Sequence, residues 1–145
     1  MKTVKIIFLA VSLMHASIGL AKSKQGYCKA GLGAVAQYSS TIDDLQSITS
    51  GLIKTADAAA TTLKKAKRRF DAVDDSISQI KRSLSRYCKS AATKRPNFSG
   101  VLNASFRDLQ RGNHYLLAAR AADTGKLRAR LASMSAFNKM KKVLF

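Results

Sequence analysis

The fold is decided by residues 28–88, which read CKAGLGAVAQYSSTIDDLQSITSGLIKTADAAATTLKKAKRRFDAVDDSISQIKRSLSRYC. Counted from Cys28 in steps of seven, apolar or small residues fill the first and fourth places of nearly every heptad, for example Val35, Ile42 and Phe70. Many of the other places hold Lys, Arg, Asp, Ser or Gln. This is the period of a helix with coiled-coil-like packing. No proline interrupts the stretch, so we expect it to be helical.

The first 21 residues have the pattern of a secretory signal peptide. Lys2 and Lys5 precede a short apolar run, and Gly19 and Ala21 form a small-x-small cleavage site. The apolar run is too short to span a bilayer. We therefore predict that residues 1–21 are removed and that the mature chain is secreted or periplasmic, where disulfides form. Export also argues against nucleic acid as a partner.

Cys28 and Cys88 decide whether the heptads form one helix or two. A single helix would place their Cα atoms about 90 Å apart, whereas a disulfide needs them within about 7 Å. An even pair of cysteines in an exported chain predicts one disulfide, and an intramolecular bridge requires a helical hairpin. We place its tip between Ser50 and Asp57, with Asp57 capping the second helix. Free thiols or an intermolecular bridge are the alternatives.

The rest of the chain predicts a loop and further helices. Residues 89–99 contain Lys94-Arg95-Pro96-Asn97, which favours a loop, and Ser99 is a suitable N-cap for a following helix. Gly112-Asn113 could kink or divide that helix. We expect Asp123-Thr124-Gly125 to end it, with the glycine as C-cap, and a last helix to start at Lys126.

The predicted fold is therefore all-α. It is a single domain over residues 22–145, in which a disulfide-tied helical hairpin at 28–88 packs with one or two further helices from residues 100–145 as a small helical bundle. The acceptor pattern for N-glycosylation occurs at Asn97 and Asn103, and it matters only in a eukaryotic secretory route.

The charge of the chain is strongly positive and unevenly distributed. Loss of Lys2 and Lys5 leaves 24 basic residues against 8 acidic ones, a formal net charge of +16. From Lys64 onward there are 20 basic and five acidic residues. Such segregation attracts anionic partners. Outside the cytoplasm these are an anionic membrane surface, a sulfated or phosphorylated glycan, or an acidic protein.

Two stretches concentrate this positive charge. The first stretch, residues 64–69, has cations at a spacing that matches the phosphates or sulfates of a polyanion. A solvated helix face is an equally good interpretation. The second stretch lies in the last twenty residues, 126–145, which contain no acidic residue. That segment can be a cationic helix at a membrane interface, or a bundle helix that packs Leu127, Leu131 and Met134 on the hairpin, which we favour. The predicted polyanion-binding residues are Lys64, Lys65, Lys67, Arg68 and Arg69 in the first stretch and Lys126, Arg128, Arg130, Lys139, Lys141 and Lys142 in the second.

Catalytic and metal-binding patterns are weak, and we predict no enzyme activity and no cofactor. His114 with Asp108 or Asp123 lacks a defined serine for a triad, and Cys28, Cys88 and His114 lack metal-ligand spacing. The leading hypothesis is a non-enzymatic protein that binds an anionic surface and that could be membrane-active. The alternative is a helical assembly or adaptor subunit, for example of an envelope or secretion apparatus. It would bind an acidic protein or self-associate through its heptads.

Overall fold

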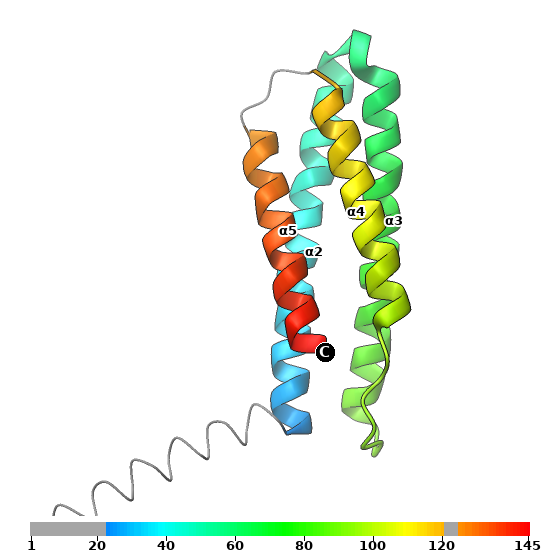
Figure 1. The fold of residues 1–145 in the computed structure, drawn as a ribbon, viewed down its shortest axis with the longest axis vertical. Coiled ribbons are helices and arrows are strands. Elements are labelled where there is room, and N and C mark those ends of the chain that lie inside the picture. The colour runs from blue at the N-terminus through cyan, green and yellow to red at the C-terminus, as the bar shows by residue number, and fades with distance from the viewer. Residues whose placement is uncertain (1–22, 121–124) are drawn as a thin grey trace, which may run out of the picture.

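The computed structural model describes residues 23–120 and 125–145, and within them the chain forms four α-helices and one short 3-10 turn. The helices run alternately up and down along one long axis (Figure 1). This arrangement confirms the predicted all-α bundle. The predicted signal peptide lies outside the described residues. The elements are α2 (Lys24–Thr55), η1 (Asp57–Ala59), α3 (Ala60–Lys89), α4 (Ser99–Ala118) and α5 (Gly125–Leu144).

Helices α2 and α3 form the predicted antiparallel hairpin. A disulfide joins Cys28 to Cys88 with their Cα atoms 5.9 Å apart, which confirms the pairing expected from the sequence. The chain turns at Ala56, inside the predicted tip. The expected cap is wrong, because Asp57 starts η1, and α3 follows Ala59 without a side-chain cap.

The disulfide end of the hairpin is held by aromatic rings and cations. Each cysteine follows a tyrosine, and the rings of Tyr27 and Tyr87 meet edge to face with centroids 6.0 Å apart. Lys24 Nζ lies 4.5 Å from the centre of the Tyr87 ring and donates hydrogen bonds to the carbonyl oxygens of Ser90 and Ala92. The positive charge of Lys24 is therefore used to close this end of the bundle.

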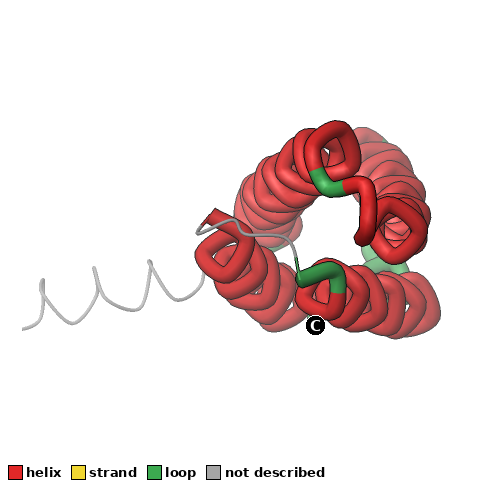
Figure 2. The backbone as a smooth tube through the Cα atoms, turned by 90° about the horizontal axis from the view of Figure 1, so that it is seen from above, coloured by secondary structure: helices red, strands yellow, loops and turns green. Residues whose placement is uncertain are grey.

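The bundle has three well-packed sides and one looser side. Helix α2 packs against α3 and α5, and α3 packs against α2 and α4, whereas α4 and α5 touch at far fewer places. Seen from above, the helices therefore follow the order α5, α2, α3, α4 around the bundle (Figure 2). As a result, α3 and α5 occupy opposite corners.

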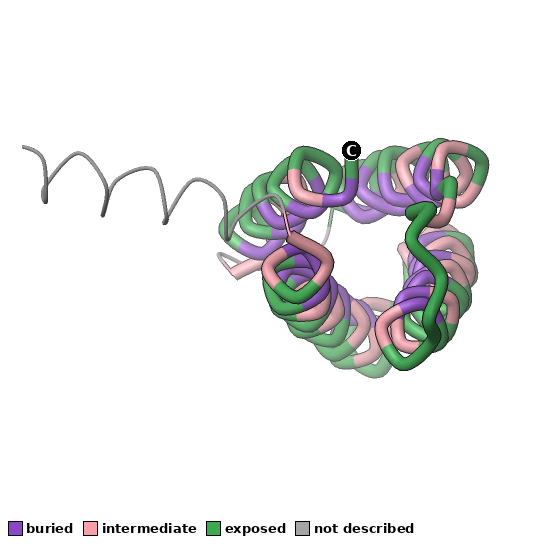
Figure 3. Tube along the Cα trace, turned by 90° about the horizontal axis from the view of Figure 1, so that it is seen from below, coloured by how far each residue is buried: buried purple, intermediate pink, exposed green. Residues whose placement is uncertain are grey.

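The heptad positions supply the core between α2 and α3. Their large side chains are buried, and the buried residues lie along the inner side of the bundle (Figure 3). Full burial of one such side chain contributes about 1.5–3 kcal/mol. Phe70, Ile77, Ile80 and Leu84 lie in this core, as their heptad places predict. The other large heptad side chains that are buried are Val35, Tyr38, Ile42, Leu45, Leu52, Leu63, Val73 and Tyr87.

An aromatic cluster closes the looser side between α4 and α5. Phe137 of α5 stacks on Phe106 of α4 with ring centroids 5.1 Å apart, and it meets the ring of Tyr38 edge to face at 5.6 Å. The buried hydroxyl of Tyr38 is hydrogen-bonded to Ser105 Oγ at 3.0 Å. Burial raises the pKa of Tyr38 above its usual range. The hydroxyl therefore stays protonated and links α2 to α4.

The ends of α4 differ from the expectation. Ser99 is the first helical residue instead of the N-cap, and Phe98 takes the N-cap position without a side-chain cap hydrogen bond. In the turn before the helix, Asn97 Oδ1 accepts hydrogen bonds from the backbone N–H and the hydroxyl of Ser99. The helix continues through Gly112 without division. It ends at Ala118, and Gly125 begins α5 instead of ending α4.

Candidate functional site

The buried face of α5 is not the one that we favoured from the sequence. Leu127 and Leu131 are 55% and 64% exposed, and Met134 is half-buried. Because Ala129 and Ser133 are small, this face of α5 can lie close to its neighbours. The expectation that the leucines pack on the hairpin is therefore wrong. The buried residues of α5 are Ala129, Ser133, Ala136, Phe137, Met140 and Leu144.

The leucines that point outward form one stripe. Leu127 and Leu131 are four residues apart and therefore lie on the same side of α5, and Met134 follows three residues later. Phe145, directly after the helix, is also exposed. The four large apolar residues that are exposed in the described chain are these two leucines, Phe145 and Leu117 of α4. The exposed apolar surface is therefore concentrated in the second half of the chain.

All six predicted cations of α5 lie on a helix that contains no acidic residue. Four of them are exposed: Arg128, Lys139, Lys141 and Lys142. Lys139 Nζ also donates a hydrogen bond to Gln37 Oε1 at 3.2 Å. Lys126 and Arg130 are half-buried.

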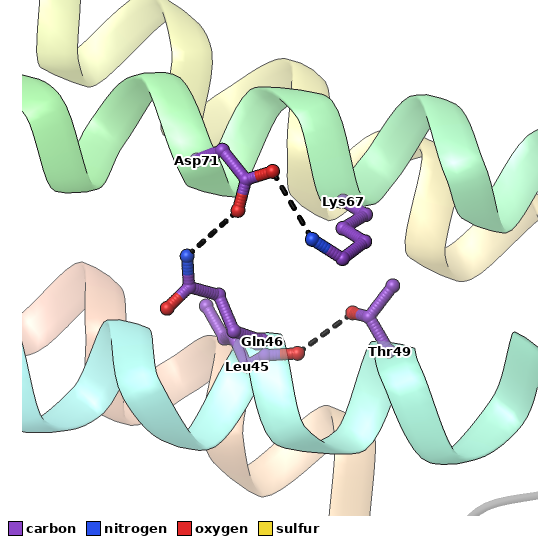
Figure 4. A network of polar contacts seen from close by, with 5 residues as sticks. All are labelled: Leu45, Gln46, Thr49, Lys67 and Asp71. Atoms are coloured by element: carbon purple, nitrogen blue, oxygen red, sulfur yellow. Dashed lines mark hydrogen bonds and ion pairs between the residues drawn. The ribbon is translucent and has the colours of Figure 1, made fainter.

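The predicted cluster on α3 divides into two groups. Lys64, Lys65 and Arg68 are exposed on the outer side of the helix. Lys67 instead forms an ion pair on the hairpin. Its Nζ lies 3.2 Å from the Asp71 carboxylate, and the same carboxylate accepts a hydrogen bond from Gln46 of α2 (Figure 4). Lys67 therefore lies at the seam of the hairpin with its side chain 45% exposed, and its part in polyanion binding stays a prediction.

Arg69 reaches toward α4 and pairs with Asp108 at 3.1 Å. Lys65 Nζ lies over the ring of Tyr115, which is also on α4, 5.9 Å from the ring centroid. Arg111 lies three residues after Asp108 and four before Tyr115, so all three share the side of α4 that borders α3. Arg111 is exposed. We call Lys64, Lys65, Arg68 and Arg111 the α3–α4 cationic face. Arg111 was missed because no sequence pattern pairs α3 with α4.

The α5 surface and the α3–α4 cationic face do not merge. The first lies on α5 and the second is centred on α3, at the opposite corner of the bundle (Figure 2). The polyanion-binding residues predicted from the sequence are therefore distributed over two separate surfaces.

The acidic side chains lie mainly along the seam of α2 and α3. The pKa of the Asp74 carboxyl is raised by partial burial and by the nearby charges of Asp43, Asp75 and Asp71. These carboxylates come from both helices of the hairpin. The protein therefore has a negative strip on the hairpin as well as its two cationic surfaces.

The remaining candidates for chemistry lie apart from one another. Cys28 and Cys88 are joined to each other. His114 is exposed beside Tyr115, and Asp108 pairs with Arg69. Asp123 lies outside the described residues. Over residues 23–120 and 125–145, no three His, Cys, Asp or Glu side chains gather in a way that could hold a metal ion.

Within residues 23–120 and 125–145, no helix has an apolar stretch long enough to cross a bilayer. Comparison of the chain with protein-family models, with curated proteins and with solved structures gave no match.

Proposed function

We propose that this chain is an exported, non-enzymatic protein that binds an anionic membrane surface through the exposed side of α5. The observation that carries the proposal is the exposure of Leu127 and Leu131 on a helix that has six cations and no acid. A helix of this kind lies in the plane of the interface, with its apolar stripe among the acyl chains and its cations at the headgroups. The Cys28–Cys88 disulfide is typical of the oxidising compartments outside the cytoplasm and supports export.

The expected strength is that of reversible peripheral binding. Covering the exposed part of each leucine contributes about 1 kcal/mol, and each cation near an anionic surface contributes about 1 kcal/mol. Two leucines and the four exposed cations of α5 together give roughly 6 kcal/mol, which corresponds to dissociation constants of tens of micromolar. Because most of this attraction is electrostatic, binding should weaken strongly as salt is added.

The alternative of an assembly subunit has less support. The heptad positions of residues 28–88 are buried between α2 and α3. A partner helix would therefore have to bind a different surface. Association through apolar heptads would also persist in high salt, whereas the proposed binding would not.

The proposal is tested by co-sedimentation with phosphatidylglycerol-containing and pure phosphatidylcholine vesicles. The unchanged protein should bind only the anionic vesicles. Replacement of both leucines (Leu127→Ser with Leu131→Ser) should weaken binding by about 2 kcal/mol, roughly 30-fold, without loss of helix content. The matched control, Ala30→Ser with Ala36→Ser, places the same hydroxyl groups on exposed positions of α2 and should bind normally. Equal binding by the leucine variant would refute the assignment to α5.

A further inference from the structure

The α3–α4 cationic face has a composition different from that of the α5 surface. Lys64, Lys65 and Arg68 are within one turn of one another on α3, and Arg111 extends the patch sideways onto α4. No large apolar residue of α3 is exposed. The exposed side chains that define the patch are therefore cations, and the patch extends over two helices. That shape suits a flat array of headgroups better than a single linear glycan chain.

The separation of the two surfaces decides what the α3–α4 cationic face can touch. Neighbouring helices in a bundle lie 8–10 Å apart, so helices at opposite corners lie about 13 Å apart, and addition of the helix radii places their outer sides about 25 Å apart. Charge interactions are screened over about 8 Å at physiological ionic strength. Once α5 lies on a membrane, the cations on the outer side of α3 are too far from that membrane to add to the attraction.

We infer that the α3–α4 cationic face docks on a second anionic membrane, so that one molecule bridges two lipid surfaces. This inference rests on the proposed binding of the first membrane through α5. The contact at α3 is electrostatic only, whereas α5 also inserts its leucines. Added salt should therefore release the second membrane before the first.

The test uses the purified protein with phosphatidylglycerol-containing vesicles and two readouts. Co-sedimentation measures binding, and dynamic light scattering measures vesicle clustering. The variant Lys64→Gln, Lys65→Gln, Arg68→Gln removes three exposed cations of the patch. The matched control, Lys54→Gln, Lys81→Gln, Lys89→Gln, removes the same charge from exposed positions scattered over α2 and α3.

We expect the unchanged protein and the control to bind and to cluster vesicles. The α3 variant should bind within about twofold of the unchanged protein, because its lost charges lie beyond the screening length, but it should not cluster vesicles. Clustering should also disappear at a lower salt concentration than binding does.

Three outcomes contradict the inference, and they are distinguishable. If the unchanged protein binds vesicles without clustering them, bridging is refuted and the proposed function stands. If the α3 variant clusters vesicles as well as the control does, bridging arises elsewhere, for example from dimers that present two copies of α5. If the unchanged protein does not bind anionic vesicles at all, the proposed function fails and bridging fails with it.

Discussion

The ring of Phe70 lies so close to Gly112 that a Cβ atom added there would come within 2.6 Å of the ring carbon Cε1. Because Gly112 has no side chain, α4 can approach α3 closely at this point. The Arg69–Asp108 ion pair and the contact of Lys65 with Tyr115 lie nearby. The position of Arg111 beside the α3 cations therefore depends on a glycine inside a helix.

Gly112→Ala should destabilise the protein, because the new methyl group must displace the buried ring. We expect a net loss of roughly 1–2 kcal/mol, since overpacking outweighs the better helix propensity of alanine. The control Gly33→Ala has open space around its Cβ and should instead stabilise the protein by about 0.5–1 kcal/mol. Urea unfolding of both variants measures the difference. Stabilisation by Gly112→Ala would contradict this contact, because it would show that α3 and α4 lie further apart than the Phe70–Gly112 distance implies.

Loss of the disulfide should lower the stability markedly. The bridge joins residues that are 60 positions apart, and in the chain-entropy model a loop of this length is worth about 4 kcal/mol. The Cys28→Ser, Cys88→Ser double variant should melt at a much lower temperature, while the oxidised protein should run as a monomer on a non-reducing gel. A disulfide-linked dimer on that gel would contradict the hairpin.

Ile77→Asp should unfold the bundle. The side chain is 3% exposed in the α2–α3 core, and an unpaired carboxylate cannot be buried there without a large cost. Gln79→Asp introduces the same charge two residues away at an exposed position and should leave the melting curve nearly unchanged. Circular dichroism during heating compares the two. A cooperative, unshifted transition for Ile77→Asp would mean that the helix register is incorrect.

Asp74→Asn should stabilise the protein at neutral pH. The pKa of Asp74 is raised in the folded state, so the folded state binds the proton more tightly than the unfolded state does, and stability falls as the pH rises through this range. Asparagine removes this partly buried charge and its repulsion from the neighbouring carboxylates. The gain in melting temperature at pH 7 should vanish below about pH 3, where aspartate is protonated in both states. A gain that is independent of pH would exclude this cause.

Arg120→Gly should stabilise the end of α4. Arg120 has a φ of 52°, in the left-handed region that costs a residue with a Cβ about 1 kcal/mol and that glycine adopts readily. Arg111→Gly removes the same side chain from the interior of α4 and should cost about 1 kcal/mol. Denaturant midpoints of the two variants should therefore move in opposite directions.

The heptads and the two cysteines determine the hairpin from the sequence alone. The helical period is a local property, and helix length combined with disulfide geometry requires a turn, which the sequence places between Ser50 and Asp57. The burial of Phe70 and Ile77 follows from the same period. The helix ends were predicted less well: Asp57 and Ser99 were expected as N-caps, whereas Ala59 and Phe98 take these positions without a side-chain cap. The start of a helix depends on how the backbone turns as well as on the nearest polar residue.

Only the tertiary structure decided which side of α5 is buried and which cations stand together. The sequence of α5 offers a broad apolar arc, and the choice between Leu131 and Ser133 depends on how closely α5 approaches its neighbours. Likewise, Arg69 and Asp108 are 39 positions apart, and no local period relates them. Contacts between helices depend on their order around the bundle, and that order is set by packing of the whole core.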